Sequence, residues 1–246
     1  MTFTIILVIL VSLLLLRADW FINKLPFRLS KNEYIDYQIK YQPFLFLSAA
    51  LLMLLIEWST KQQLWRYFSI GNIDAPTVKM GLFGIQEGDH WLQTGVSLCV
   101  VISLVTGIFM YFQLKKQQVN WSILVPNLGW ILLFALSNAI GEEVLFRLGI
   151  VGSLSGIQAP MLIFFISGIL FGIPHYWGMP SGIIGAILAG VLGYVLAKSV
   201  YETGGLFWAC TIHFLQDVII MGSLLLIKSN NYWPGVPVLK PLNRHR

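Results

Sequence analysis

The chain has 246 residues, of which 57% are hydrophobic and only 11% are charged, whereas a typical soluble domain carries about 25% charged residues. This composition, with a mean hydropathy of +0.74, excludes a soluble globular enzyme and a disordered protein. The net charge of +5 does not indicate nucleic-acid binding, because the lysines and arginines lie in the connections between apolar runs rather than on one face.

The apolar runs are long enough to cross a membrane as helices, which takes about 20 residues each. We predict seven spans in chain order, at 3–20, 42–58, 91–112, 122–146, 160–177, 182–201 and 205–227. Aromatic residues that prefer the headgroup layer mark their ends, namely Trp20, Trp58, Trp91, Trp121, Trp177, Tyr201 and Trp233. The predicted fold class is therefore all-α, a polytopic membrane helix bundle of about seven transmembrane helices, with six to eight allowed.

The spans fall into three parts of the chain. Residues 1–120 hold about three membrane helices and a long 59–90 loop with Gly and Pro, residues 121–228 hold the remaining helices, and 229–246 form a basic tail. The first run has no basic segment before it and no small-residue cleavage site, which favours a retained anchor over a secretory signal. Cys99 and Cys210 lie within apolar runs, away from other Cys or His, so neither a disulfide nor a zinc knuckle is indicated.

The basic residues predict the orientation. Connections on one side of the membrane hold eleven of the 16 basic residues: Arg17, Lys24, Arg28, Lys31, Lys40, Lys115, Lys116, Lys228, Lys240, Arg244 and Arg246. The other side holds Lys61, Arg66, Lys79, Arg147 and Lys198. Because cytoplasmic connections carry the excess of Lys and Arg, we expect an amino terminus outside, a cytoplasmic carboxyl terminus and a location in the cell membrane.

Three short segments place ionisable residues inside or at the ends of spans, where each charge costs roughly 2.5–3.5 kcal/mol at mid-membrane. They are 141–147 in the fourth span, 171–175 in the fifth and 213–217 in the seventh. Such residues must pair with one another or face a hydrated cavity. Their charged and imidazole side chains are Glu142, Glu143, Arg147, His175, His213 and Asp217.

Helical spacing predicts which of these residues pair. Glu143 and Arg147 are four residues apart on one helix face, an arrangement that favours an acid–base pair. Glu142 is rotated by about 100° from Glu143 and lacks that partner. A free carboxylate is suited to taking a proton from water. His213 and Asp217 also share a face, and Phe171 can wall His175 at the same spacing.

Two chemical roles remain open for these groups. Two histidines with carboxylates position a water molecule, or they hold zinc or another divalent metal that does so. The candidate metal ligands are His175, His213, Glu142 and Asp217. Each segment alone also has a simpler interpretation: the 142–147 run as an interfacial salt bridge, and His175 after Pro174 as a headgroup-level residue. The conjunction of the three segments favours a functional site.

At these residues the sequence resembles the CPBP family of CAAX proteases and bacteriocin-processing enzymes, also called the Abi family. The family pattern is E-E-x3-R, then F-x3-H, then H-x3-N or H-x3-D, each on its own membrane helix. This sequence has all three in order, as Glu142-Glu143-x3-Arg147, Phe171-x3-His175 and His213-x3-Asp217. The resemblance covers 122–227, and it marks 121–228 as a CPBP-like catalytic core, whereas 1–120 carry no signature.

The resemblance implies an integral membrane endopeptidase that cleaves membrane-associated peptide or protein substrates. By position, Glu142 would be the base that activates water, His175 and His213 would orient that water or bind metal, and Asp217 would support the same cluster. Glu143 with Arg147 would be their structural and electrostatic partner. At 217, prenyl-protein proteases of the family carry Asn. Members process prenylated CAAX proteins or act in peptide processing and bacteriocin immunity, so substrate, metal and oligomeric state stay open.

Two alternatives come from other functional classes. A non-catalytic member would act as a membrane scaffold or immunity factor that binds a peptide. A proton-coupled transporter is disfavoured because no internal repeat is evident.

Two geometric expectations follow. With straight spans, Glu142 and His175 would differ in depth by more than about 10 Å, so the fourth helix must continue past Arg147 or the fifth must be short or tilted. In the sixth span, small residues at four-residue spacing predict a close helix–helix approach: Gly185, Ala189 and Gly193, with Gly182, Ala186 and Gly190 beside them.

Overall fold

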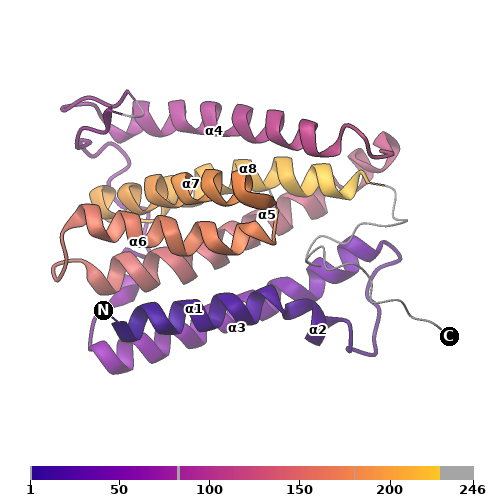
Figure 1. Cartoon of the computed structure of the whole chain (residues 1–246), viewed down its shortest axis with the longest axis horizontal. Helices are drawn as coiled ribbons and strands as arrows, with labels where there is room; N and C mark the ends of the chain where they lie inside the picture. Colours follow the sequence, from indigo (N-terminus) through magenta and orange to yellow (C-terminus); the bar gives the residue numbers. More distant parts are fainter. Residues whose placement is uncertain (1, 82–83, 180, 228–246) are drawn as a thin grey trace.

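The computed structural model describes residues 2–81, 84–179 and 181–227, and every regular element within these ranges is helical (Figure 1). This confirms the predicted all-α fold class. The helices are α1 (Thr2–Leu16), α2 (Ala18–Ile22), α3 (Glu33–Thr60), α4 (Trp91–Leu114), α5 (Leu128–Glu143), α6 (Pro160–Gly172), α7 (Gly182–Thr203) and α8 (Phe207–Leu225). Short helical turns are η1 (Leu64–Tyr67), η3 (Trp121–Ile123), η4 (Val125–Asn127), η5 (Val144–Gly152) and η6 (Ile173–Tyr176). The predicted basic tail at 229–246 lies outside the described residues.

The helices match the predicted spans in number. Five segments are long and apolar enough to cross a membrane, namely α3, α4, Trp121–Gly152, α7 and α8, and two shorter apolar helices are Thr2–Leu16 and Pro160–Tyr176. The main difference is at the second span, which was predicted to begin at 42 and begins at Glu33. There the Asn32 side chain caps the helix by accepting a hydrogen bond from Ile35 N at 3.1 Å. The first turns of α3 are rich in polar and aromatic residues, so the hydropathy of the sequence did not mark them as part of the span.

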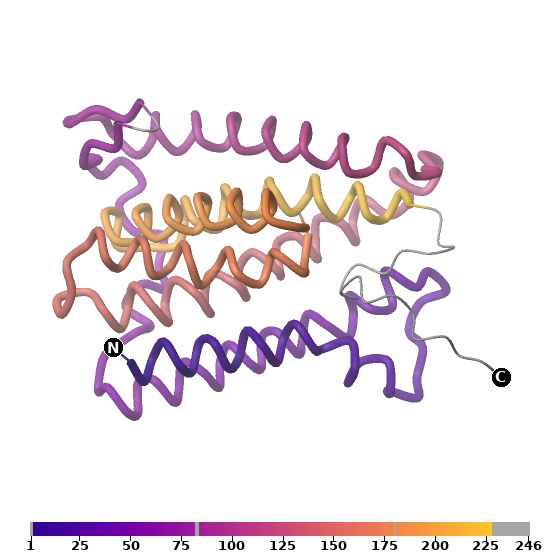
Figure 2. The backbone as a smooth tube through the Cα atoms, in the orientation of Figure 1, coloured from indigo at the N-terminus to yellow at the C-terminus, as the bar shows by residue number. Residues whose placement is uncertain are grey.

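The bundle has a central group of helices covered on two sides (Figures 1 and 2). Helices α5 to α8 form the centre, α4 covers one side by packing on α8, and α3 covers the other by packing on α5 and η5. The first helix, α1, runs along α3 and also contacts η5 and η6. Both cysteines are free, as expected.

The closest approach in the centre is between α6 and α7. A Cβ atom added at Gly172 would lie 2.6 Å from the Ala186 carbonyl oxygen, and one at Gly168 would lie 2.7 Å from the Gly190 carbonyl oxygen. A Cβ at Gly193 would meet the Phe171 Cβ at 2.9 Å. The predicted close approach is therefore found at Ala186, Gly190 and Gly193, whereas a Cβ atom on Gly182 would meet nothing within 4 Å. This approach holds the end of α6, and with it Phe171, against α7.

Helix α5 does not end after the two glutamates. It continues as η5, a π-helix in which all nine residues are buried. The sequence had predicted that, for Glu142 and His175 to lie at one depth, the fourth helix could continue past Arg147, and it does. Glu142 therefore lies within the 32-residue segment Trp121–Gly152 rather than at a span end. Helix α6 is also short, with 13 residues before η6. A π-helix is uncommon and often occurs at functional sites.

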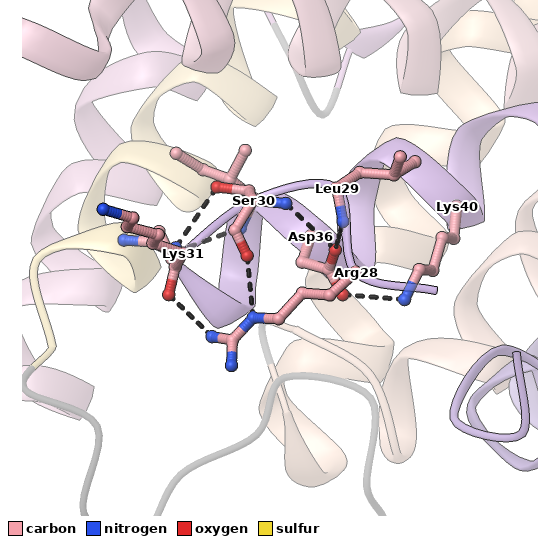
Figure 3. A network of polar contacts seen from close by, with 8 residues as sticks. Arg28, Leu29, Ser30, Lys31, Asp36 and Lys40 are labelled. Carbon is pink, nitrogen blue, oxygen red and sulfur yellow. Dashed lines mark hydrogen bonds and ion pairs between the residues drawn. The ribbon is translucent and has the colours of Figure 1, made fainter. Parts of the chain in front are cut away.

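The start of α3 is fixed by a polar network (Figure 3). Asp36 Oδ1 accepts hydrogen bonds from Leu29 N at 2.5 Å and Ser30 N at 3.2 Å, and its Oδ2 pairs with Lys40 Nζ at 2.7 Å. Arg28 donates from Nε to the Ser30 carbonyl at 2.8 Å. The network ties the preceding connection to the first turns of α3, and these turns border the cavity described below.

The opposite end of the bundle is closed by the 61–90 connection. Its backbone docks on the turn between α7 and α8, where Asn72 N donates to the Thr203 carbonyl at 2.8 Å and Leu206 N donates to the Ser69 carbonyl at 2.8 Å. Gly71 and Gly205 come so close that a Cβ on Gly71 would lie 2.6 Å from Gly205 N. Residues 69–72 of the longest predicted loop therefore cover the α7–α8 turn.

A buried ion pair lies near this cover. Lys198 Nζ pairs with Glu202 Oε1 on α7, and Trp91 Nε1 donates to Glu202 Oε2 at 2.8 Å. The side chains of Lys198 and Glu202 are 3% and 7% exposed. Lys198 is therefore not a charge in a connection, as the orientation count had taken it.

Candidate active site

One cavity of about 770 Å³ opens at the end of the bundle where α1 ends. Its walls come from the last turns of α1, the first turns of α3, α5, residues 174–179 with 181 and 182, and α8 from His213 onward. Glu142, His175, His213 and Asp217 all line it. The structure thus brings together, at one cavity, the four side chains that were expected to share one. Their catalytic roles remain a prediction.

Behind the cavity wall lies a fully buried acid–base pair. Arg147 Nε is 2.9 Å from Glu143 Oε2, and both side chains are 0% exposed. Glu143 Oε1 in turn lies 2.8 Å from His213 Nδ1. Glu143 therefore connects the arginine of η5 to the histidine of α8. Neither Glu143 nor Arg147 lines the cavity, so the geometry gives them a supporting place.

The Arg147 guanidinium has a second stabilising contact. It lies over the Phe171 ring, 4.5 Å from the ring centroid. Among the described residues its Nη1 and Nη2 atoms have no hydrogen-bond partner, and its approach to Glu143 is an ion pair without hydrogen-bond alignment. The buried positive charge is therefore held by one carboxylate and one aromatic face.

His213 is oriented by Glu143 and presents its other nitrogen to the cavity. Since Arg147 favours an ionised Glu143, the Nδ1–H of His213 donates to that carboxylate. Nε2 then lies 3.7 Å from Glu142 Oε2 and 3.6 Å from Asp217 Oδ2. These separations are too long for direct hydrogen bonds. Nε2 and Glu142 are both left free to contact a third group.

The two glutamates differ in exposure as their helical phases predicted. The Glu142 side chain is 17% exposed, whereas the Glu143 side chain is 0% exposed. Because Glu143 is occupied by Arg147 and His213, Glu142 is the carboxylate of the pair that is available at the cavity.

His175 is fixed by its own helix end. Its Nδ1 donates to the Phe171 carbonyl at 2.8 Å, and its ring contacts the Phe171 ring at 4.8 Å between centroids. Phe171 also meets His213 edge-on, at 5.5 Å and 89°. With Nδ1 bound to a carbonyl, neutral His175 carries a free lone pair on Nε2. One phenylalanine thus contacts both histidines and the arginine.

The structure adds residues that sequence reasoning missed. Asn138 of α5 lines the cavity and donates from Nδ2 to Asp217 Oδ2 at 3.0 Å. A polar residue four positions before Glu142 in an apolar stretch was the available signal. From α3, a face of residues at i, i+3, i+4 and i+7 also lines the cavity, formed by Tyr34, Tyr37, Gln38 and Tyr41. No motif marked that face, because α3 precedes the region of the resemblance.

The metal hypothesis stays a prediction. In the three described ranges, no group of three or more His, Cys, Asp or Glu side chains is arranged to hold a metal ion. Zinc requires nitrogen and oxygen donors to converge at about 2.0–2.2 Å from one point. The candidate ligands share the cavity without forming a ligand set.

The bundle thus gathers carboxylates and histidines around one cavity between apolar helices. Residues 124–219 match the family model described as type II CAAX prenyl endopeptidase Rce1-like. The match spans all three motifs and confirms the predicted resemblance to the CPBP family. The match and the apolar helices together support an intramembrane endopeptidase in general terms. Searches of curated proteins and of solved structures found no match.

Proposed function

We propose that the protein is an intramembrane endopeptidase in which Glu142 activates a water molecule for attack on a peptide carbonyl. The observation that carries the proposal is the division of labour between the two glutamates. Glu143 is fully buried and bound to Arg147 and His213, while Glu142 faces the cavity without a short partner of its own. A general base must have its carboxylate within reach of water.

The chemical steps balance without a further reactant. Glu142 takes a proton from water as the oxygen forms a bond to the scissile carbonyl carbon. The proton then passes from Glu142 to the leaving nitrogen as the C–N bond breaks, which regenerates the carboxylate. Each step needs proton transfer over hydrogen-bond distances of about 2.6–3.2 Å.

The histidines supply orientation and charge stabilisation. The lone pair on His175 Nε2 accepts a hydrogen bond from the attacking water. In its protonated form, His213 donates from Nε2 to the carbonyl oxygen as negative charge develops there, while Glu143 stabilises the imidazolium through Nδ1. Asp217 borders the same nitrogen at 3.6 Å. Because the described side chains form no metal ligand set, the proposed mechanism uses water and protein groups alone.

The cavity favours a substrate with an apolar part. Apolar and aromatic side chains of α1, α8 and the 174–182 connection line it, including Leu13, Leu16, Trp177, Ile220 and Leu224. Arg17 also lines it. In the predicted orientation this end of the bundle faces the cytoplasm. The proposed substrate is therefore a membrane-tethered peptide presented from the cytoplasmic side, and the name of the matching family makes a prenylated peptide the first one to test.

The test is cleavage of a fluorogenic peptide tethered to proteoliposomes by a farnesyl group or by a transmembrane helix. We expect Glu142→Gln to lower kcat by about 10²–10⁴-fold, the usual contribution of a general base. The matched control is Glu57→Gln, since Glu57 accepts a hydrogen bond from Leu64 N outside the cavity. Undiminished turnover by the Glu142 variant would overturn the proposal. Full cellular function of a Glu142→Gln/His213→Ala protein would favour the scaffold alternative.

A further inference from the structure

We infer that Asn138 is a positioning residue of this active site, which holds the Asp217 carboxylate beside His213 and keeps the His213 Nε2 atom available to substrate. The inference rests on the proposed endopeptidase function. Asn138 belongs to none of the three motifs.

The contacts of Asn138 connect two helices at the cavity. Its side chain is on α5, the residue is 8% exposed, and its Nδ2 donates to Asp217 Oδ2 on α8 at 3.0 Å. The same Asp217 oxygen faces His213 Nε2 at 3.6 Å. One carboxylate oxygen is therefore hydrogen-bonded to an amide on one side and separated from an imidazole on the other.

Asn138 also lies on the same face of α5 as the proposed base. It precedes Glu142 by four residues, so the two side chains lie on one face of the helix. Glu142 and Asp217 both line the cavity, and their negative charges would repel each other there. The Asn138 amide places hydrogen-bond donors on the Asp217 side of this pair of carboxylates.

The consequence concerns His213. Asp217 is four residues beyond His213 on one helix face, which is the spacing for a direct acid–imidazole contact. Released from Asn138, the Asp217 carboxylate is free to close the 3.6 Å gap and to occupy Nε2. Nε2 would then be unavailable to a substrate carbonyl. The amide prevents this by drawing the Asp217 oxygen toward α5.

A nearby amide provides the matched comparison. Gln216, next to Asp217 in sequence, is also 8% exposed and donates from Nε2 to Thr106 Oγ1 on α4 at 3.2 Å. It makes the same kind of interhelical hydrogen bond but does not line the cavity. A purely structural role for Asn138 predicts the same behaviour for both residues, whereas a positioning role predicts a difference in turnover.

The experiment compares Asn138→Leu with Gln216→Leu in the reconstituted cleavage assay and in thermal unfolding. We expect both variants to lower Tm similarly. Only Asn138→Leu should lower kcat, by about 10- to 100-fold, as expected for a hydrogen bond to a charged group. KM should change by less than about twofold, because the lost contact acts on the transition state rather than on substrate binding.

A rescue variant keeps the test decisive if Asn138→Leu folds poorly. Asn138→Asp places a carboxylate opposite Asp217 and should be nearly inactive. Asn138→Asp/Asp217→Asn restores one amide and one carboxylate in reversed order, and we expect its kcat to exceed that of the single Asn138→Asp variant by about tenfold or more.

Two results would overturn the inference: an unchanged kcat in Asn138→Leu, or no recovery in the reversed pair. They are distinguishable from failure of the proposed function, because Glu142→Gln serves as the reference. If Glu142→Gln is inactive while Asn138→Leu is fully active, only the positioning role fails.

Discussion

Two buried clusters of charged side chains stabilise this bundle, and they differ in what lies beside them. Glu143 and Arg147 form one pair, and Lys198 and Glu202 form the other, each at a spacing of four residues. In the second cluster both Glu202 oxygens are occupied, by Lys198 and by Trp91. The first cluster continues through His213 to groups at the cavity. A buried charge is therefore no mark of chemistry by itself, and an adjoining cavity supplies the distinction.

The comparison also corrects the orientation count. Arg147 and Lys198 were both counted as connection charges, yet each is buried within a helical segment and paired. The Lys40 side chain is likewise 8% exposed and paired with Asp36 inside α3. Without these three, the side predicted to be outside keeps Lys61, Arg66 and Lys79 against ten basic residues on the other side. The orientation, with the carboxyl terminus in the cytoplasm, stays a prediction.

The largest effect is expected from Arg147→Met. It leaves Glu143 buried without its counter-ion, which should lower the free energy of unfolding by about 3–5 kcal/mol, and it releases the carboxylate that orients His213, so kcat should also fall. The measurement is thermal unfolding in detergent alongside turnover. In Glu143→Met/Arg147→Met, both charges are gone, and Tm should recover while kcat stays low. Recovery of both would mean that the pair is structural only.

The next largest effect is expected from Lys198→Met. Glu202 keeps its hydrogen bond from Trp91 Nε1, so the loss of stability should be smaller, about 1–3 kcal/mol. The pair is not part of the cavity wall, and kcat per folded molecule should stay within about twofold of the wild type. If Lys198→Met lowers kcat as much as Arg147→Met does, the two clusters do not differ in their effect on catalysis.

A smaller effect is expected from Tyr41→Phe. Tyr41 lines the cavity together with Glu142 and Asp217. Removing its hydroxyl should lower kcat/KM by about fivefold, as for one neutral hydrogen bond. Tyr201→Phe is the control, since that ring packs against Phe164 away from the cavity. Equal behaviour of the two variants would exclude α3 from the site.

The smallest effect is expected from metal removal. Dialysis of the reconstituted protein against a strong chelator should change turnover by less than about twofold, since the cavity groups form no ligand set for a Lewis-acid metal. Elemental analysis of active protein before and after dialysis checks the result. Loss of one equivalent of zinc together with activity, restored by adding zinc, would replace the glutamate-only mechanism with a metal-dependent one.

The sequence predicted those parts of the site that depend on spacing within one helix. The Glu143–Arg147 pair and the different direction of Glu142 follow from helical periodicity alone. Periodicity does not encode which helices become neighbours, so the bond between Glu143 and His213 and the bond between Asn138 and Asp217 could not be predicted. The same limit applies to the α3 face at Tyr34–Tyr41, which joins the site from about 100 residues earlier in the chain.

The sequence predicted that the fourth helix could continue past Arg147, but it did not predict that this continuation, η5, is a π-helix. The depth mismatch demanded a helix that continues past Arg147, yet nothing in the composition of Val144–Gly152 marks a π-helix. The segment is buried throughout, with Met53 close to Gly149 and Leu64 close to Gly152. These neighbours come from α3 and η1, and periodicity within the segment does not encode them.

The backbone contact between Gly71 and Gly205 lies at the end of the bundle away from the cavity, and the described cavity wall contains no residue from that end. Under the proposed function, the cleaved fragments would then leave by the route that the intact chain used to enter. A released fragment that retains the tether should therefore act as a competitive inhibitor of the next turnover.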